Sequence, residues 1–452
     1  MNGKRIVCDE CTRADLLRAT AGRGLPAIEP GMPVPAGTGL TRRGFVARSL
    51  GIAFAVYGVG RLAAFDEGIA NAAAAGPQPI LVTVFLQGGA DSLSLLYPQG
   101  DPLYAKYRKT LAVSGGSAFT EDARLFWHPS LAPLAQLHDE GKVSVLPAVG
   151  YDHPDQSHFT SRHYWEVGAT DPRLLTGWLG RYLDTIGSPD NPLQGLSLGG
   201  SLQPSLATAR VPVATIDSPG QYDFYTPGVW GSVQDRLLDA IGGLGAVRSH
   251  DAAFTTAADV ARQSDRLRRQ LAPFAGKKLT PPVQYPTSSD SFPTQLSGLA
   301  AMIAAGLPLH CVSLEATGSY DTHADQTTEL GPALDTTAAS LFAFQRDLEA
   351  RGIADRVLVH VWSEFGRRGA ENGSGGTDHG AAGVGFLVGT RAKGQMIGEF
   401  PDLKSGLDED GNVRATSDFR GVYASLLEQW LGMDAAAVIP GAGSFARSAL
   451  VK

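Results

Sequence analysis

Cysteine is scarce in this chain of 452 residues, which contains three, at Cys8, Cys11 and Cys311. Cys8 and Cys11 form a C-x-x-C pair, but no second pair of ligands accompanies it, so a zinc or redox centre there is disfavoured. If an N-terminal leader is removed, Cys311 is the one cysteine left, which excludes a disulfide within the mature chain. A disulfide framework is therefore not expected.

Positive charge is also in short supply, with 38 Lys and Arg against 45 Asp and Glu and a formal net charge of -7. A protein that follows nucleic-acid phosphates needs a positive face, so the acidic balance disfavours nucleic acid as a partner. Hydrophobic residues make up 43% of the chain, which is ample for one large or two moderate cores. The 55 glycines and 28 prolines indicate many loops rather than a helical bundle.

The N-terminal region lacks an apolar run long enough to span a membrane. Residues 49–65 are moderately apolar, but Arg61 interrupts them, and the uninterrupted part is shorter than the ~20 residues of a spanning helix. The twin-arginine pattern TRRGFV precedes this stretch at Thr41–Val46, and small residues follow it near Ala72–Ala75. This order predicts that residues 1–75 are an N-terminal extension and a cleaved twin-arginine export signal.

Export by this route implies the twin-arginine translocase as a partner. We then expect the mature chain outside the cytoplasmic membrane, in the periplasm, the cell envelope or the extracellular space, with no stable transmembrane span. The mature domain is predicted to cover residues 76–452.

Short apolar runs alternate with helical patterns throughout this mature domain. Ile80–Leu86 and Val357–Trp362 are rich in β-branched residues and read as buried strands, whereas Gly331–Ala350 has helical spacing. The alternation predicts an α/β fold, with a mostly parallel, doubly wound sheet flanked by helices. The region of about 190–295 reads as a loop-rich insertion that would shape specificity.

Polar clusters follow four of the predicted strands. The carboxyl ends of parallel strands share one edge of a sheet, and ligands collect there. We therefore expect the four clusters to meet at one edge. They are Asp91; Ser157 with His158; Asp321 with His323; and Glu364 followed by Asp378 and His379.

Each cluster alone also has an ordinary structural explanation. Asp91 suits a helix cap, Ser157 suits either an N-cap or a hydroxyl beside an anion-binding helix N-terminus, and the Asp321–His323 pair suits a core hydrogen bond. This explanation predicts that the clusters lie far apart. If they meet, oxygen and imidazole donors without thiolate suit one or two divalent cations, Zn, Mn, Mg or Ca.

The ordered motifs LQGGADS, GYDHPDQSHF, YDTH, SEFGRR and GTDHG, with the twin-arginine leader, resemble the exported family labelled domain of unknown function 1501. That family is regarded as a distant member of the alkaline phosphatase and sulfatase superfamily, so the resemblance implies an alkaline-phosphatase-like fold. It implies Ser157 as the nucleophile position. The metal ligands that it implies are Asp91, Asp321, His323, Glu364 and His379, with Asp378 as a further candidate.

Two hypotheses for function follow. The first is an exported metal-dependent hydrolase of phosphate or sulfate esters, in which Ser157 attacks beside His158 and Arg162 or Arg367 holds substrate oxygens. The second is a catalytically inactive binding or assembly protein of the cell envelope that keeps the fold and pairs with another exported protein. Phe365 motivates the second, because the superfamily has a histidine ligand at that position. An ordinary sulfatase is disfavoured, since Cys311 lacks a Cys/Ser-x-Pro-x-Arg context.

Overall fold

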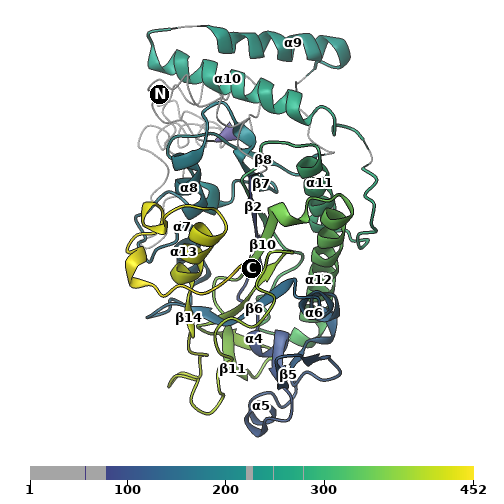
Figure 1. Ribbon diagram of the computed structural model, residues 1–452, viewed down its shortest axis with the longest axis vertical. Helices are drawn as coiled ribbons and strands as arrows, with labels where there is room; N and C mark the ends of the chain where they lie inside the picture. The colour runs from purple at the N-terminus through teal and green to yellow at the C-terminus, as the bar shows by residue number, and fades with distance from the viewer. Residues whose placement is uncertain (1–55, 58–77, 220–225, 227, 248, 278) are drawn as a thin grey trace, which may run out of the picture.

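The computed structural model describes the chain outside residues 1–55, 58–77, 220–225, 227, 248 and 278 (Figure 1). Apart from the two-residue strand β1, the predicted extension and export signal therefore fall outside the described residues, and so do Cys8 and Cys11. None of the described helices is both long and apolar enough to cross a membrane.

The centre of the molecule is a mixed sheet, which has nine strands among the described residues, in the order β1-β8-β7-β9-β2-β10-β13-β6-β14. Five neighbouring strands, from β8 to β10, run parallel to one another. β13 is antiparallel to both of its neighbours, so β6 and β14 run in the same direction as the first five. The predicted, mostly parallel sheet is confirmed. The strands are β1 (Val56–Tyr57), β2 (Ile80–Phe85), β6 (Val143–Gly150), β7 (Gly195–Leu198), β8 (Val213–Ile216), β9 (Cys311–Glu315), β10 (Val357–Trp362), β13 (Gly383–Val388) and β14 (Ser417–Asp418).

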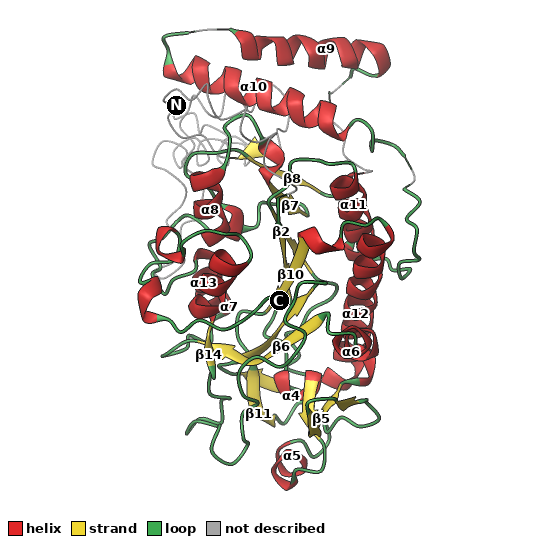
Figure 2. Ribbon diagram, in the orientation of Figure 1, coloured by secondary structure: helices red, strands yellow, loops and turns green. Residues whose placement is uncertain are grey.

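Helices cover both faces of this sheet, as a doubly wound fold requires (Figure 2). Side chains alternate along β2, so that Val82 and Val84 face one hydrophobic cluster while Leu81 and Phe85 face the other. On one face lie α6 (Ala132–Asp139), α11 (Phe292–Ala304) and α12 (Gln326–Ala350). On the other lie α7 (His158–Val167), α8 (Trp178–Ile186) and α13 (Phe419–Gln429).

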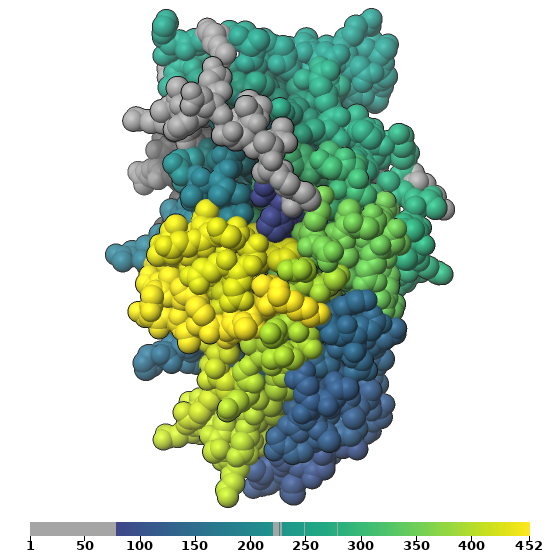
Figure 3. Space-filling view, viewed as in Figure 1, coloured from purple at the N-terminus to yellow at the C-terminus, as the bar shows by residue number. Residues whose placement is uncertain are grey.

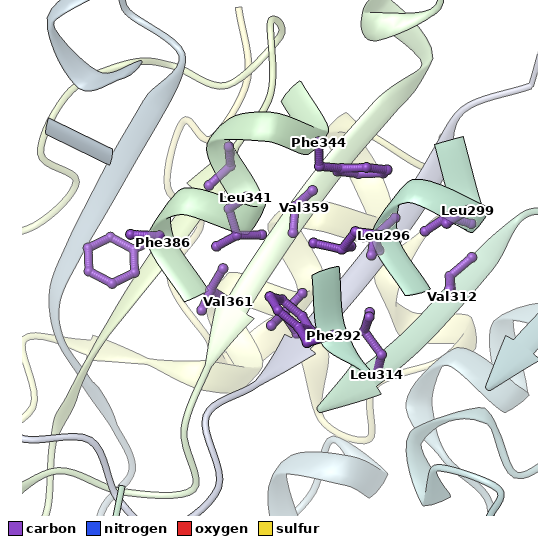
Figure 4. Close-up of a cluster of buried hydrophobic side chains, with 14 of the residues drawn as sticks. Phe292, Leu296, Leu299, Val312, Leu314, Leu341, Phe344, Val359, Val361 and Phe386 are labelled. Carbon is purple, nitrogen blue, oxygen red and sulfur yellow. The ribbon is translucent and has the colours of Figure 1, made fainter. Parts of the chain in front are cut away.

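The first of these clusters is the larger core. Figure 4 shows Phe292 and Leu296 of α11 and Phe344 of α12 beside Val359 and Val361 of β10. Because both faces of the central strands are buried, their sequences are continuous apolar runs and not alternating ones. This is the pattern that made these strands visible in the sequence.

Residues 190–295 contain more regular structure than predicted. β7 and β8 belong to the main sheet, so this part of the region is not a loop-rich insertion. The region also contains α9 (Gly231–Gly243) and α10 (Ala252–Leu271), which pack against each other at one end of the molecule. In the space-filling view these helices form the end opposite to α5 and β5 (Figure 3).

Two small sheets complete the fold near the carboxyl edge of the main one. The order of the first is β3-β5-β4, and the second pairs β11 with β12. A short helix, α4, joins β2 to β3. These elements are α4 (Ser92–Leu95), β3 (Leu96–Pro98), α5 (Pro102–Tyr107), β4 (Ala118–Phe119), β5 (Asp122–Trp127), β11 (Arg367–Glu371) and β12 (Thr377–His379).

His360 lies within β10 and is buried, with its ring edge-on to Tyr423 at a centroid separation of 5.8 Å. Burial lowers the pKa of His360 from 6.5 to about 3. Between these values the unfolded chain binds a proton that the folded chain excludes, so the free energy of unfolding should fall as the pH falls from about 6.5 to about 3. The slope from this group is at most about 1.4 kcal/mol per pH unit.

His360→Leu should remove this contribution. Urea unfolding of the wild type and the variant at several pH values between 7 and 4 measures it. An equally steep loss of stability in both proteins would contradict the assignment to His360.

Candidate metal centre

The loops after β2, β6, β9 and β10 meet at one edge of the main sheet, as the sequence predicts. The backbone N–H groups of Gly88 and Gly89, after β2, donate to the carboxylate of Glu364, after β10. His158, after β6, donates from Nδ1 to the same carboxylate at 2.8 Å. Asp321, after β9, has its Oδ2 3.4 Å from His158 Nε2. The alternative that the four clusters lie far apart is therefore wrong.

The centre of this edge is a group of three imidazoles around Asp321. One ligand atom from each of His158, Asp321 and His379 lies within 4.8 Å of the others. His323 adds a third ring, with its Nε2 2.9 Å from His379 Nε2 and 3.2 Å from Asp321 Oδ1. His158 Nε2 is buried and has no hydrogen-bond partner. All three Nε2 atoms thus lie beside the carboxylate of Asp321, those of His323 and His379 next to Oδ1 and that of His158 next to Oδ2.

An oxygen lies beside the other nitrogen of each ring. Nδ1 of His158 is 2.8 Å from Glu364 Oε1, and Nδ1 of His379 is 2.8 Å from the carbonyl oxygen of Gln156. Nδ1 of His323 lies 3.5 Å from Asp378 Oδ1. Because these oxygens only accept hydrogen bonds, His158 and His379 in their neutral form carry their hydrogen on Nδ1 and present a lone pair at Nε2.

The arrangement fits the donor set of a divalent metal centre. The Nε2 atoms of His323 and His379 are 2.9 Å apart, a separation at which one ring donates a hydrogen bond to the other or both rings bind one cation. Histidines that bind metals commonly donate their other N–H to a carboxylate or a carbonyl oxygen. Three imidazoles and one carboxylate are ligands typical of zinc and also suit manganese.

The surroundings shift the pKa values of the cluster residues in different directions. The hydrogen bond to Glu364 raises the pKa of His158 above its ordinary value, although burial opposes this shift. Burial lowers the pKa of His379. Burial acts to raise the pKa of Asp321, yet the hydrogen bond and charge of Arg367 hold it below the usual value. Asp321 is therefore charged and His379 neutral near pH 7, the forms in which both bind metals.

The two arginines predicted to hold substrate oxygens have other partners. Arg367 is completely buried and donates to the carbonyl oxygens of Gly89 and Thr377 and, at 2.5 Å, to Asp321 Oδ1. Its hydrogen bond therefore orients Asp321, and because it is buried it cannot contact a substrate. Arg162 is held by Glu166 and Glu315, each at 2.8 Å, and lies over the ring of Phe85.

Asp91, predicted as a metal ligand, is not part of the imidazole group and is paired with an arginine instead. Asp91 is 1% exposed, and both of its carboxylate oxygens pair with the buried guanidinium of Arg108. Ser94 and Gln326 donate to Oδ2 as well. Both oxygens of this carboxylate thus already accept hydrogen bonds, one of them from three donors.

Glu364 and Asp378 contact the Nδ1 side of two histidine rings, on the side of each ring away from Asp321. Glu364 is 1% exposed and accepts from the amides of Gly88 and Gly89, from Ser363 and from His158. Asp378 accepts from Asn372 at 3.0 Å and faces His323. Both carboxylates lie next to histidine rings, and as placed they orient these rings; their predicted role as metal ligands stays a prediction.

Ser157 is exposed and is the N-cap residue of α7, between two residues that contact the cluster. Gln156 accepts from His379, and His158 belongs to the cluster itself. The side chain of Ser157 makes no capping hydrogen bond, while its N–H donates to Asp155 Oδ1 at 2.7 Å. The hydroxyl is therefore free, next to the unpaired amides of a helix N-terminus.

Arg108 and Gln326 were missed in the sequence, and no local signal distinguishes them. Arg108 follows α5 in a segment with several basic residues, and Gln326 begins α12. Gln156 lies inside the motif GYDHPDQSHF, but it contributes its backbone carbonyl, which carries no sequence signal.

The family model described as "Protein of unknown function (DUF1501)" matches residues 237–439, which confirms the family resemblance predicted from the motifs. The matched region includes Asp321, His323 and His379. No curated protein matches the chain.

Several solved structures are similar to the chain. A protein in the alkaline phosphatase superfamily from Vibrio parahaemolyticus is 10% identical, with a TM-score of 0.34 over 96% of this chain and 76% of that one. A sulfatase from Pseudoalteromonas sp. is 11% identical, with a TM-score of 0.33 over 84% and 75%. A phosphonate monoester hydrolase from Silicibacter pomeroyi is 12% identical, with a TM-score of 0.31 over 82% and 75%. The chemistry of the site has to follow from its own side chains.

Proposed function

We propose that this chain, whose residues 237–439 match the DUF1501 family model, is an exported metal-dependent hydrolase of phosphate or sulfate esters. His158, Asp321 and His379 would hold the cation, with His323 beside them. The observation that carries the proposal is the convergence of three Nε2 atoms on Asp321 while an oxygen lies beside each Nδ1. The leader sequence TRRGFV supports the export.

Charge supports a cation at this point. The groups in direct contact with the cluster include three carboxylates, Asp321, Glu364 and Asp378, and one guanidinium, Arg367. With neutral imidazoles the set has two negative charges in excess, which one divalent cation balances. When bound, such a cation stabilises negative charge that develops on an ester oxygen and lowers the pKa of a nearby hydroxyl.

Ser157 is the proposed nucleophile. Its exposed hydroxyl makes no capping hydrogen bond and stands at the N-terminus of α7, where the backbone amides favour the oxygens of a phosphate or sulfate group. Attack on phosphorus or sulfur forms a covalent ester to Ser157 and releases the alcohol, and water then hydrolyses this ester. Arg367 keeps Asp321 in place throughout through its buried hydrogen bonds.

An assay of purified residues 76–452 with 4-nitrophenyl phosphate and 4-nitrophenyl sulfate, with zinc or manganese added, tests the proposal. Ser157→Ala should lower turnover by at least about a hundredfold, because the nucleophile is lost, and should leave metal content unchanged. Ser291→Ala is a matched control, since Ser291 is an exposed N-cap serine of α11 without a capping hydrogen bond.

The proposal is wrong if the metal-loaded wild type hydrolyses neither ester faster than the Ser157→Ala variant does. Metal binding without turnover would instead favour the non-catalytic binding or assembly role.

A further inference from the structure

We infer that this centre holds one divalent cation and not two, because both oxygens of Asp91 and of Glu364 already accept hydrogen bonds and a phenylalanine packs against the cluster. The inference rests on the proposed metal binding and adds its stoichiometry. Two-metal hydrolytic sites place the ions about 4 Å apart, so a second ion needs its own oxygen or imidazole donors beside the first. Within the described part of the chain, one group of three or more His, Cys, Asp or Glu side chains has that spacing, and it is the group of His158, Asp321 and His379.

The first acid that could serve a second ion is Asp91, after β2. Its Oδ1 accepts from Arg108 at 2.8 Å, and its Oδ2 accepts from Arg108, Ser94 and Gln326 at 2.5, 2.7 and 2.6 Å. Arg108 is itself completely buried and donates further to the carbonyl oxygen of Gly369. A guanidinium cannot lose its proton in a protein, so Asp91 has a permanent positive partner.

The second acid is Glu364, after β10. Its Oε1 accepts from Gly88 N and His158 Nδ1 at 3.0 and 2.8 Å. Its Oε2 accepts from Gly89 N and Ser363 Oγ at 3.1 and 3.0 Å. A cation could bind Glu364 only by breaking these bonds, and the bond to His158 is one that keeps a ligand of the first ion in place.

The space beside the cluster is filled by Phe365. Its ring is 1% exposed and lies 4.9 Å from the ring of His158 and 4.7 Å from that of His379, measured between centroids. A Cβ atom at Gly89 would stand 2.3 Å from this ring, so the loop after β2 packs directly on it. An aromatic ring offers no ligand lone pair, and no gap is left between it and the loop.

Arg108 therefore provides for Asp91 the positive charge that a second ion would otherwise provide. The number of metal ions bound per chain therefore decides between one cation and two.

Two measurements on residues 76–452 test the stoichiometry. Anomalous data collected at the zinc edge from crystals grown with zinc locate each bound ion. Mass spectrometry of the dialysed protein gives the number of zinc ions per chain. We expect one zinc per chain and one peak, in contact with His158, Asp321 and His379. A second peak in contact with Asp91 or Glu364, with two zinc ions per chain, would overturn this inference and leave the proposed metal binding standing. Absence of bound zinc would overturn both.

Zinc titration of two variants distinguishes the role of Asp321, a proposed ligand, from that of Asp91, which we infer binds no cation. Asp321→Asn should lower zinc affinity more than about a hundredfold, whereas Asp91→Asn should keep one site with an affinity within about threefold of the wild type. A fall from two sites to one in Asp91→Asn would overturn the inference. If Asp91→Asn does not fold, the anomalous maps of the wild type decide the question alone.

Discussion

Replacing Arg108 with leucine is expected to lower the free energy of unfolding by about 3–5 kcal/mol, because it leaves a buried carboxylate without its partner. Arg108 and Asp91 are 0% and 1% exposed, and Arg108 donates to both oxygens of Asp91. Burial acts to raise the pKa of Asp91, but the charge and hydrogen bonds of Arg108 hold it below its usual value. At neutral pH the variant must therefore bury an unpaired charge or protonate it. Urea unfolding of residues 76–452 measures the loss.

Arg124→Leu is the matched control for this prediction. Arg124 pairs with Asp122 through Nε and Nη2, but its side chain is 84% exposed, so solvent screens the pair and the unfolding midpoint should hardly change. The double variant Asp91→Leu with Arg108→Met should regain much of the stability, since neither charge remains. Similar midpoints for Arg108→Leu and Arg124→Leu would show that Asp91 does not depend on its buried partner.

Removing the ring of His379 is expected to lower zinc affinity more than about a hundredfold, which corresponds to more than about 2.7 kcal/mol of binding free energy. His379 is the residue that joins the two sides of the cluster. Its Nε2 lies 2.9 Å from His323 Nε2 and 3.3 Å from Asp321 Oδ1, and its ring is 4.3 Å from that of His158 between centroids. Competition with a chromogenic chelator on protein first stripped with EDTA measures the affinity of His379→Ala.

His163→Ala provides the comparison. His163 is also a partly buried histidine, but it lies on the body of α7, and its Nε2 contacts the carbonyl oxygen of Asp171 at 3.3 Å. We expect its zinc affinity to equal that of the wild type. Equal affinities for His379→Ala and the wild type would contradict the assignment of the ligands, provided that circular dichroism shows both variants folded.

Much of the fold could be predicted from the sequence. The run at Ile80–Leu86 predicts β2 (Ile80–Phe85) with a difference of one residue, and the run at Val357–Trp362 predicts β10 with no difference. Both strands are buried on two faces, which demands a continuous run of apolar residues. β7 and β8 were missed because they have four residues each, too few for a clear pattern among glycine and proline.

The candidate site was predicted in its location and only partly in its members. His158, Asp321, His323 and His379 meet where the parallel strands end, as the order of motifs indicates. Each of these residues reaches the same edge because its strand runs in the same direction, or because its loop returns to that edge before β13. Direction and edge follow from the α/β pattern, so the place of the site follows as well.

By itself, therefore, the sequence determined which segments are strands and helices and which polar residues stand at the carboxyl edge of the sheet, since local periodicity and composition carry that information. Only the tertiary structure decided which acids remain available to a cation. Asp91, Glu364 and Asp321 are all carboxylates that follow buried strands, and they differ in what surrounds them: Arg108, the amides of Gly88 and Gly89, or three imidazoles. A carboxylate binds a metal only where its lone pairs are free, and that depends on neighbours in space whose separations along the chain carry no pattern.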